Sequence, residues 1–131
     1  MFPPFFASSI KLYKVSKAWN SCSTWQVKIF CVFRKAVQIL GPVYILVNCA
    51  GFATPKTFEN STIDEETQQM QLNFFGSTKA TRAVLPEMKN NNGGHIVFVA
   101  SQGGLIGLYG LSSYCASKFA IRGFAESLAM G

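Results

Sequence analysis

Two short runs of mainly apolar residues, 44–47 and 95–100, stand out in the C-terminal two-thirds of the chain. Turn-forming residues bound each run: asparagine and glycine occur in 48–51, after the first run, and in 90–94, before the second. A continuous apolar run between turn signals is typical of a strand that is buried on both faces. We therefore expect such a strand at 44–47 and a second strand of the same parallel sheet at 95–100.

Helical patterns alternate with these runs. Residues 34–40 have the pattern of the last turns of an amphipathic helix, and the glycine and proline that follow commonly end a helix. A longer helix is predicted over residues 62–89, because Thr62 and Glu65 have the spacing of a capping box. A third helix is predicted over residues 114–130. Strands that alternate with long helices indicate the α/β class with parallel crossovers.

The long predicted helix has an apolar stripe and a proline near its end. The positions expected to be buried are Met70, Phe74, Ser77 or Ala80, Val84 and Met88. Pro86 should kink or end the helix, because proline has no backbone N–H to donate within a helix.

The N-terminal part of the chain differs in composition from the rest. Residues 1–40 contain lysine and arginine but no acidic residue, whereas residues 41–131 are balanced, so the net charge of +6 comes from the first part. Residues 1–35 are predicted to be an irregular basic segment outside the domain at 36–131. A targeting presequence or a segment that touches an anionic membrane surface are the alternatives.

Composition excludes several functional classes. The chain has four cysteines without a C-x-x-C pair and one histidine, so a zinc site is not expected. The sequence contains no run of 18 apolar residues, so it does not predict a membrane span. The balanced charge of residues 41–131 does not predict a nucleic-acid-binding face.

Three residues with complementary chemistry lie around the second predicted strand. Ser101 follows the strand directly, while Tyr114 and Lys118 are four residues apart on the next predicted helix and so share one face. An ammonium beside a phenol favours the phenolate, which makes proton transfer at a carbonyl efficient, and a serine hydroxyl can orient the carbonyl oxygen. The set suits proton transfer between a carbonyl and an alcohol, with hydride from a cofactor, better than hydrolysis.

These motifs together resemble the short-chain dehydrogenase/reductase family. The sequence LVNCAG at 46–51 is similar to the family's N-N-A-G element, and Asn73 matches an asparagine of the family's next helix. Ser101, Tyr114 and Lys118 match the family's catalytic serine and its Y-x-x-x-K pair.

The resemblance implies a fold and a role for each matched residue. The fold would be part of a Rossmann-like, doubly wound parallel sheet, without the first βαβ units and the C-terminal strands. Tyr114 would be the acid/base, Lys118 would favour its phenolate, Ser101 would position the carbonyl, and Asn73 would hold a water in a proton relay. The residues expected to bind the cofactor are Asn48, Ala50, Gly51, Tyr114 and Lys118.

Within the family, residues 96–128 are similar to members that reduce a long-chain 3-keto amino alcohol in sphingolipid synthesis. The resemblance implies NADPH (NADP) as cofactor, a keto-lipid substrate, and a location on the cytoplasmic side of the endoplasmic reticulum membrane, with membrane-surface association. It also implies a homo-oligomer through the helices at 66–89 and 113–130. A relative that acts on a steroid or retinoid, and a non-catalytic truncated chain, are the alternatives.

Two departures from the family pattern affect cofactor binding. No glycine-rich T-G-x-x-x-G-x-G element precedes residue 48, and the residue that selects NAD or NADP is absent with it. Cys49 replaces the second asparagine of N-N-A-G. The glycines at 103–110 do not have the phosphate-binding spacing, and we interpret them as a flexible wall of the substrate crevice. We therefore expect this chain alone to bind NADPH weakly.

Overall fold

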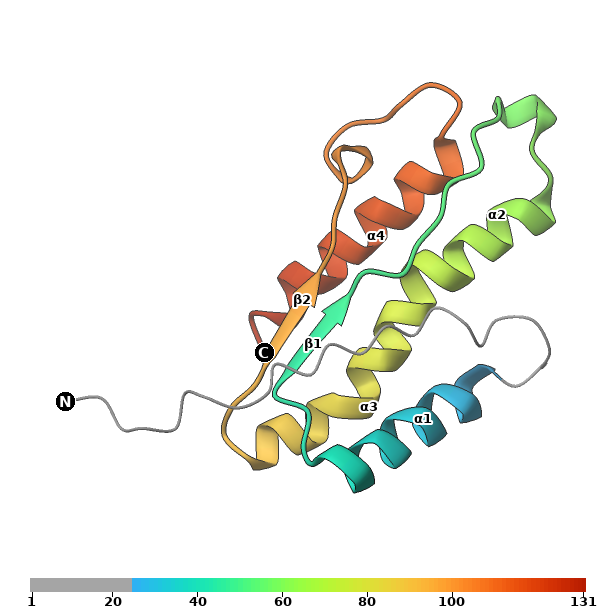
Figure 1. Cartoon of the computed structure of the whole chain (residues 1–131). Coiled ribbons are helices and arrows are strands. Elements are labelled where there is room, and N and C mark those ends of the chain that lie inside the picture. Colours follow the sequence, from blue (N-terminus) through green and yellow to red (C-terminus); the bar gives the residue numbers. More distant parts are fainter. Residues whose placement is uncertain (1–24) are drawn as a thin grey trace.

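The computed structural model describes residues 25–131, apart from the side chains of residues 25–31 and Arg34 (Figure 1). Its helices and strands, in chain order, are α1 (Trp25–Leu40), β1 (Ile45–Asn48), α2 (Ile63–Met70), the π-helical segment η2 (Gln71–Gly76), α3 (Ser77–Asn90), β2 (His95–Phe98) and α4 (Ser112–Leu128). Two 3₁₀ turns, η1 (Phe58–Asn60) and η3 (Gln102–Gly104), lie in the loops that follow the strands.

The two strands pair in parallel, which confirms the predicted α/β class. Ile45 lies opposite His95 and Asn48 opposite Phe98, and the chain between the strands crosses through α2, η2 and α3. Both strands therefore end at the same edge, so the loops after Asn48 and after Phe98 are neighbours. A backbone hydrogen bond of 2.9 Å from Val99 N–H to the Asn48 carbonyl joins these loops directly.

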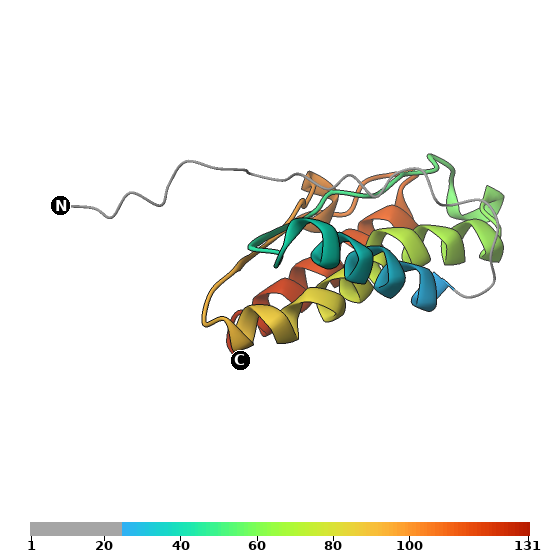
Figure 2. The ribbon, with the colours of Figure 1, turned by 60° about the horizontal axis from the view of Figure 1, so that its bottom comes forward.

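Only one face of the described sheet is covered. Leu46 and Asn48 are buried, whereas Ile45 and Val47 are 42% and 36% exposed. In the ribbon of Figure 2 the strands and loops form one layer and the helices the other. The expectation that the strand at 44–47 is buried on both faces is therefore wrong for residues 25–131, because their helices all pack on the Leu46 face. The outer face of Val97 and Val99 is open as well.

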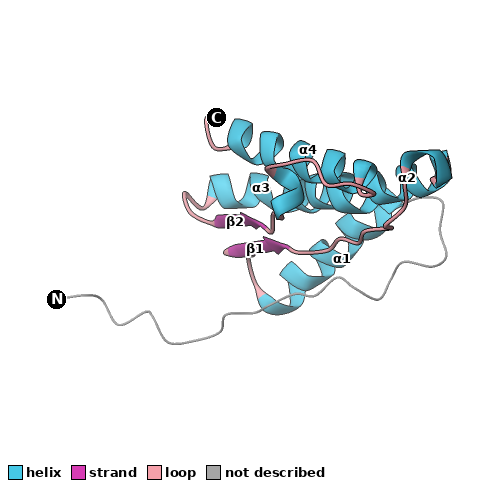
Figure 3. Ribbon diagram, turned by 90° about the horizontal axis from the view of Figure 1, so that it is seen from above, coloured by secondary structure: helices cyan, strands magenta, loops and turns pink. Residues whose placement is uncertain are grey.

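The core lies between α1, α3 and β1. Its buried members are Phe33, Leu46, Val84 and Met88, and Val43, Ala80, Ala83 and Ile96 pack against them. The predicted burial of Ser77, Val84 and Met88 is confirmed, while Met70, Phe74 and Ala80 are only half-buried. Seen from above, as in Figure 3, α3 lies between α1 and α4.

The helix α1 begins earlier than the sequence predicted. Residues 25–35, expected to be irregular, form its first turns. Phe33 and Ala36 are buried because α1 packs along α3, and this tertiary contact stabilises a segment whose own pattern is weak. The rest of the predicted basic segment, residues 1–24, lies outside the described residues.

Local signals correctly placed both the start and the end of the long helix. The Thr62 hydroxyl accepts from Glu65 N–H at 3.3 Å, and the Glu65 carboxylate accepts from Thr62 N–H at 3.1 Å, so the capping box is confirmed. The predicted end at residue 89 is confirmed to within one residue, because α3 ends at Asn90; only the alternative that Pro86 itself ends the helix is wrong. Pro86 is exposed, while its neighbours Val84 and Met88 are anchored in the core and hold this part of the helix in place.

A row of buried polar residues follows the same helix, namely Gln69, Asn73, Ser77 and Thr81. In a regular α-helix, four residues advance about 40° beyond one turn, so a row at this spacing would rotate away from its neighbours. The π-helical segment η2 widens the turns around Asn73, which keeps the row facing the interior. Among residues 25–131, no helix is both long and apolar enough to span a membrane.

Candidate active site

Ser101 lies just beyond the end of β2, at the sheet edge where both strands stop. It is the N-cap of η3, and its hydroxyl oxygen accepts a hydrogen bond from Gly103 N–H at 3.2 Å. This bond leaves the hydroxyl proton of Ser101 available to another acceptor. The side chain is half-buried.

The turn η3 packs directly on α4, and two glycines make this possible. A Cβ atom at Gly103 would lie 3.1 Å from Cε1 of Tyr114, and one at Gly104 would lie 3.1 Å from the carbonyl oxygen of Lys118. Both glycines are buried. They therefore form a tight contact rather than the flexible wall that we expected, and this contact brings the Ser101 loop against the part of α4 that carries Tyr114 and Lys118.

Lys118 is nearly buried, and its ammonium group has no acidic partner among residues 25–131. Its Nζ donates a 3.0 Å hydrogen bond to the Val99 carbonyl and lies 5.8 Å from the centroid of the Tyr114 ring. Lys118 is 7% exposed. Within residues 25–131 the ion pairs join Lys56 to Glu65 and Arg122 to Glu126, so no carboxylate neutralises Lys118 there.

The Asn73 side chain connects the loop after β1 to α4. Its Oδ1 accepts from Phe52 N–H and its Nδ2 donates to the Phe52 carbonyl, each at 2.9 Å. The same Nδ2 donates to the hydroxyl of Ser117, also at 2.9 Å. Asn73 is 2% exposed, so a nearly water-free contact joins three separate segments.

The segment 48–51 runs beside this group of residues. The Asn48 side chain is buried and donates to the Thr81 hydroxyl at 3.3 Å, while Cys49 and Ala50 are exposed. A Cβ atom at Gly51 would lie 3.2 Å from Oδ1 of Asn73 and 3.6 Å from Nζ of Lys118. The backbone of Gly51 thus forms one wall next to the ammonium.

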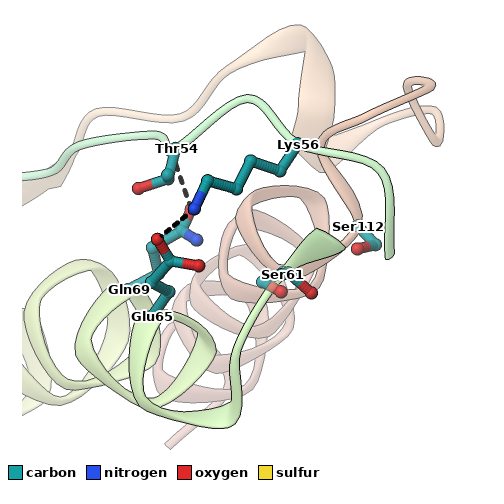
Figure 4. Close-up of a pocket in the computed structure, with 7 residues that line it drawn as sticks. Thr54, Lys56, Ser61, Glu65, Gln69 and Ser112 are labelled. Carbon is teal, nitrogen blue, oxygen red and sulfur yellow. Dashed lines mark hydrogen bonds and ion pairs between the residues drawn. The ribbon is translucent and has the colours of Figure 1, made fainter. Parts of the chain in front are cut away.

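A second group of polar side chains fixes the loop between β1 and α2 (Figure 4). Lys56 pairs with Glu65 at 2.5 Å, and the Gln69 side chain accepts from Thr54 N–H at 3.3 Å. Lys56 N–H also donates to the Gly110 carbonyl at 2.9 Å, which ties this loop to the one before α4. The hydrogen bond from Lys56, followed by one from Thr62 N–H, lowers the pKa of Glu65 below its ordinary value of 4.5.

Sequence reasoning did not identify three participants in this site. They are the Ser117 hydroxyl, the Val99 carbonyl and the backbone of Phe52. Backbone groups carry no residue signature, so the last two could not be found from side-chain type. Ser117 carried a weak signal, because it is a polar residue one turn from Tyr114 on the predicted helix.

Comparison with known proteins identifies the class. The profile of the family described as short chain dehydrogenase matches residues 23–131, so the chain belongs to the short-chain dehydrogenase family, whose members are oxidoreductases that use NAD or NADP. A short-chain dehydrogenase of Streptomyces avermitilis superimposes with a TM-score of 0.77 at 35% identity, over 81% of this chain and 39% of that one.

The chain is also similar to individual curated proteins of known name. The chain is 48% identical to 3-dehydrosphinganine reductase of Danio rerio over 99 residues. This aligned segment covers 76% of this chain and 30% of that protein. The chain is 53% identical over 92 residues to 3-ketodihydrosphingosine reductase of Dictyostelium discoideum, covering 67% and 27%. Epidermal retinol dehydrogenase 2 of Mus musculus is 45% identical over 100 residues, covering 74% and 32%. The chain spans about a third of the length of these relatives.

The residues present fit part of a nicotinamide cofactor site. The ammonium of Lys118, which has no carboxylate partner among residues 25–131, is suited to hydroxyl acceptors such as those of a ribose. Gly51, without a side chain, leaves room beside that ammonium that a Cβ atom would fill. The backbone N–H groups of Gly103 and Gly104 in η3 already donate to the hydroxyl and the carbonyl of Ser101, so neither is free here to bind a phosphate.

Proposed function

We propose that this chain carries the catalytic segment of an NADPH-dependent carbonyl reductase that converts 3-ketodihydrosphingosine to dihydrosphingosine in sphingolipid biosynthesis. The observation that carries the chemistry is the nearly buried ammonium of Lys118, one helical turn from Tyr114 and without a carboxylate partner in residues 25–131. The substrate is proposed from the similarity to the Danio rerio and Dictyostelium discoideum reductases.

The proton chemistry falls to Tyr114 and Lys118. NADPH, when bound, supplies a hydride to the carbonyl carbon. The phenol of Tyr114 gives its proton to the carbonyl oxygen, so the ketone gains one hydride and one proton and becomes a secondary alcohol. The ammonium of Lys118 stabilises the phenolate that remains, and it is held in place by the Val99 carbonyl.

Ser101 and Asn73 support this transfer in different ways. The Ser101 hydroxyl accepts from Gly103 N–H, so its proton can be donated to the carbonyl oxygen of the substrate and orient it. The polar atoms of the Asn73 side chain are engaged by Phe52 and Ser117. The backbone carbonyl of Asn73 accepts from the Ser77 hydroxyl at 3.3 Å and has a second lone pair, which would hold a water of the proposed proton relay.

The test is a chimera in which residues 36–131 replace the matched segment of the Danio rerio reductase, which supplies the rest of the domain. We expect the chimera to oxidise NADPH when 3-ketodihydrosphingosine is added. Tyr114→Phe should lower the rate by at least about 100-fold, the low end of what a general acid contributes. Tyr109→Phe is the matched control, because Tyr109 is 93% exposed. A full rate in the Tyr114→Phe chimera would refute the mechanism.

A second candidate substrate class follows from the similarity to epidermal retinol dehydrogenase 2. Retinoid and steroid substrates are therefore assayed with the same chimera. Turnover of a retinoid but not of the keto lipid would reassign the substrate and keep the mechanism. A folded chimera that turns over none of them would favour a non-catalytic chain.

We also propose self-association and a place at the membrane. An open groove of about 550 Å³ between α2, η2 and α4 is lined by exposed apolar residues that include Ile63 and Phe75, with Ala116 across from them. A second copy of these helices would cover it. By similarity to the sphingoid reductases, the protein would act on the cytoplasmic side of the endoplasmic reticulum membrane, at its surface. Ala116→Glu should lower the oligomeric state measured by light scattering.

A further inference from the structure

Ser117 is the most deeply buried polar residue of α4. Its exposed fraction is 0%, and its hydroxyl has two partners: it donates to the Tyr114 carbonyl at 2.7 Å and accepts from Nδ2 of Asn73 at 2.9 Å. Because its proton is already donated and no solvent reaches it, Ser117 cannot touch a substrate. Any role in the reaction must pass through its neighbours.

The Asn73 side chain, which contacts Ser117, forms a bridge between the loop after β1 and α4. Asn73 holds the Phe52 backbone with two hydrogen bonds, and Phe52 follows Gly51, whose backbone lies against the ammonium of Lys118. The Ser117 hydroxyl attaches this bridge to α4, between Tyr114 and Lys118 on the chain. The wall beside the ammonium and the helix that carries it are therefore joined at Ser117.

The geometry points to Ser117 as a positioning residue that fastens Asn73, and with it the Gly51–Phe52 wall, to the turn of α4 that carries Tyr114 and Lys118. Ser117→Ala, which replaces the hydroxyl by a hydrogen atom, would leave one Nδ2 proton of Asn73 buried and unpaired. The Asn73 side chain would then keep only its two hydrogen bonds to the Phe52 backbone, and nothing would fasten it to α4. The positioning role itself does not depend on the proposed function; only its expected effect on catalysis rests on that function.

The primary test measures amide hydrogen exchange in the 131-residue chain. We expect Ser117→Ala to speed exchange at Phe52 N–H by roughly three- to tenfold, as for the loss of one hydrogen bond. Exchange at Val84, in the core, should not change. Ser117→Cys, whose thiol bonds weakly, should be intermediate. Ser127→Ala, an exposed position on the same helix, is the matched control.

A double substitution tests whether the effect passes through Asn73. If it does, Ser117→Ala should add almost nothing to the exchange rate in an Asn73→Ala background. Equal acceleration at Phe52 and Val84 would mean that Ser117 serves only global stability and would overturn the proposal. No acceleration at Phe52 would overturn it as well. If the isolated chain does not give resolved amide signals, the same comparison is made by mass spectrometry on the peptide containing Phe52 in the chimera.

Kinetics of the chimera separate this inference from the proposed function. Ser117→Ala should lower kcat several-fold with little change in KM for the ketone, because the acid/base pair is misplaced but the substrate pocket is not. Tyr114→Phe should abolish turnover and leave exchange at Phe52 unchanged. An active Tyr114→Phe chimera with fast exchange in Ser117→Ala would reject the mechanism and retain the positioning role.

Discussion

The side-chain ammonium of Lys118 donates a 3.0 Å hydrogen bond to the backbone carbonyl of Val99. Val99 in turn donates its N–H to the carbonyl of Asn48 at 2.9 Å. The cation is thus fixed to the ends of both strands, although it comes from a helix that follows them in the chain. A nearly buried charge without a carboxylate partner among residues 25–131 is costly for folding, and such a cost is common where a charge serves function.

Replacement of Lys118 should therefore separate activity from stability. In the chimera, Lys118→Met should lower kcat by at least about 100-fold. The melting temperature should stay the same or rise, because methionine fills a similar volume and removes an uncompensated charge. Steady-state kinetics and a thermal melt on one preparation check both. Activity within threefold of the unsubstituted chimera would show that the ammonium is not needed.

Gly51 should tolerate no side chain, owing to its place beside Asn73 and Lys118. In Gly51→Ala the new Cβ atom would meet Oδ1 of Asn73 at 3.2 Å and Nζ of Lys118 at 3.6 Å. We expect kcat of the chimera to fall about tenfold, since a small displacement of catalytic groups has effects of this order or larger. Gly107→Ala is the matched control, because nothing lies within 4 Å of its Cβ position. Equal rates for the two variants would contradict the predicted contact.

Gly94 should be important for stability rather than for activity. Its φ of +156° is unfavourable for other residues, and a Cβ atom there would lie 2.6 Å from Cγ of Met88 in the core. Gly94→Ala should lower the free energy of unfolding by about 1–3 kcal/mol. In the Met88→Ala background, which removes Cγ and Sδ and leaves only the Cβ contact at 3.0 Å, denaturant titration of this variant should recover part of the loss. Additive effects of the two substitutions would show that the contact is absent.

The Lys56–Glu65 pair should make stability depend on pH in the acid range. Hydrogen bonds from Lys56 and then from Thr62 lower the pKa of Glu65 below 4.5. A carboxyl group with a lowered folded-state pKa contributes its stability above the ordinary pKa, and this contribution is lost as the pH falls below 4.5 through the folded-state value. The melting temperature should therefore fall more steeply with acid in the unsubstituted chain than in Glu65→Gln. Parallel curves would disprove the coupling.

Thiol reactivity offers a direct check of the fold. Cys49 is exposed and Cys115 is buried. In a chain with Cys22 and Cys31 replaced by serine, a thiol reagent should modify Cys49 quickly and Cys115 only on unfolding, because reaction needs an accessible thiolate. Mass spectrometry of the labelled chain counts the modified groups. Rapid labelling of both cysteines under native conditions would show that η3 does not pack on α4.

Much of the architecture could be predicted because its signals are local. The apolar runs at 44–47 and 95–100, the Thr62 capping box and the helix that begins near Tyr114 follow from short stretches of residues. The first turns of α1, and whether Pro86 would end the long helix, could not be predicted in this way. Both depend on contacts with the core, and such contacts outweigh a weak local pattern.

The sequence by itself determined which groups are available at the site: a hydroxyl after one strand, and a phenol and an ammonium on one face of the next helix. Only the tertiary structure decided how they are held. Lys118 is held by the Val99 carbonyl, and Asn73 by the Phe52 backbone; both are backbone groups, which no residue type reveals. Asn73 is also held by the Ser117 hydroxyl, which lies far from it in the chain. These contacts form because η2 directs Asn73 toward α4 and because Gly103 and Gly104 let η3 pack closely on α4. Such contacts join segments that are distant in the sequence, so short-range patterns do not predict them.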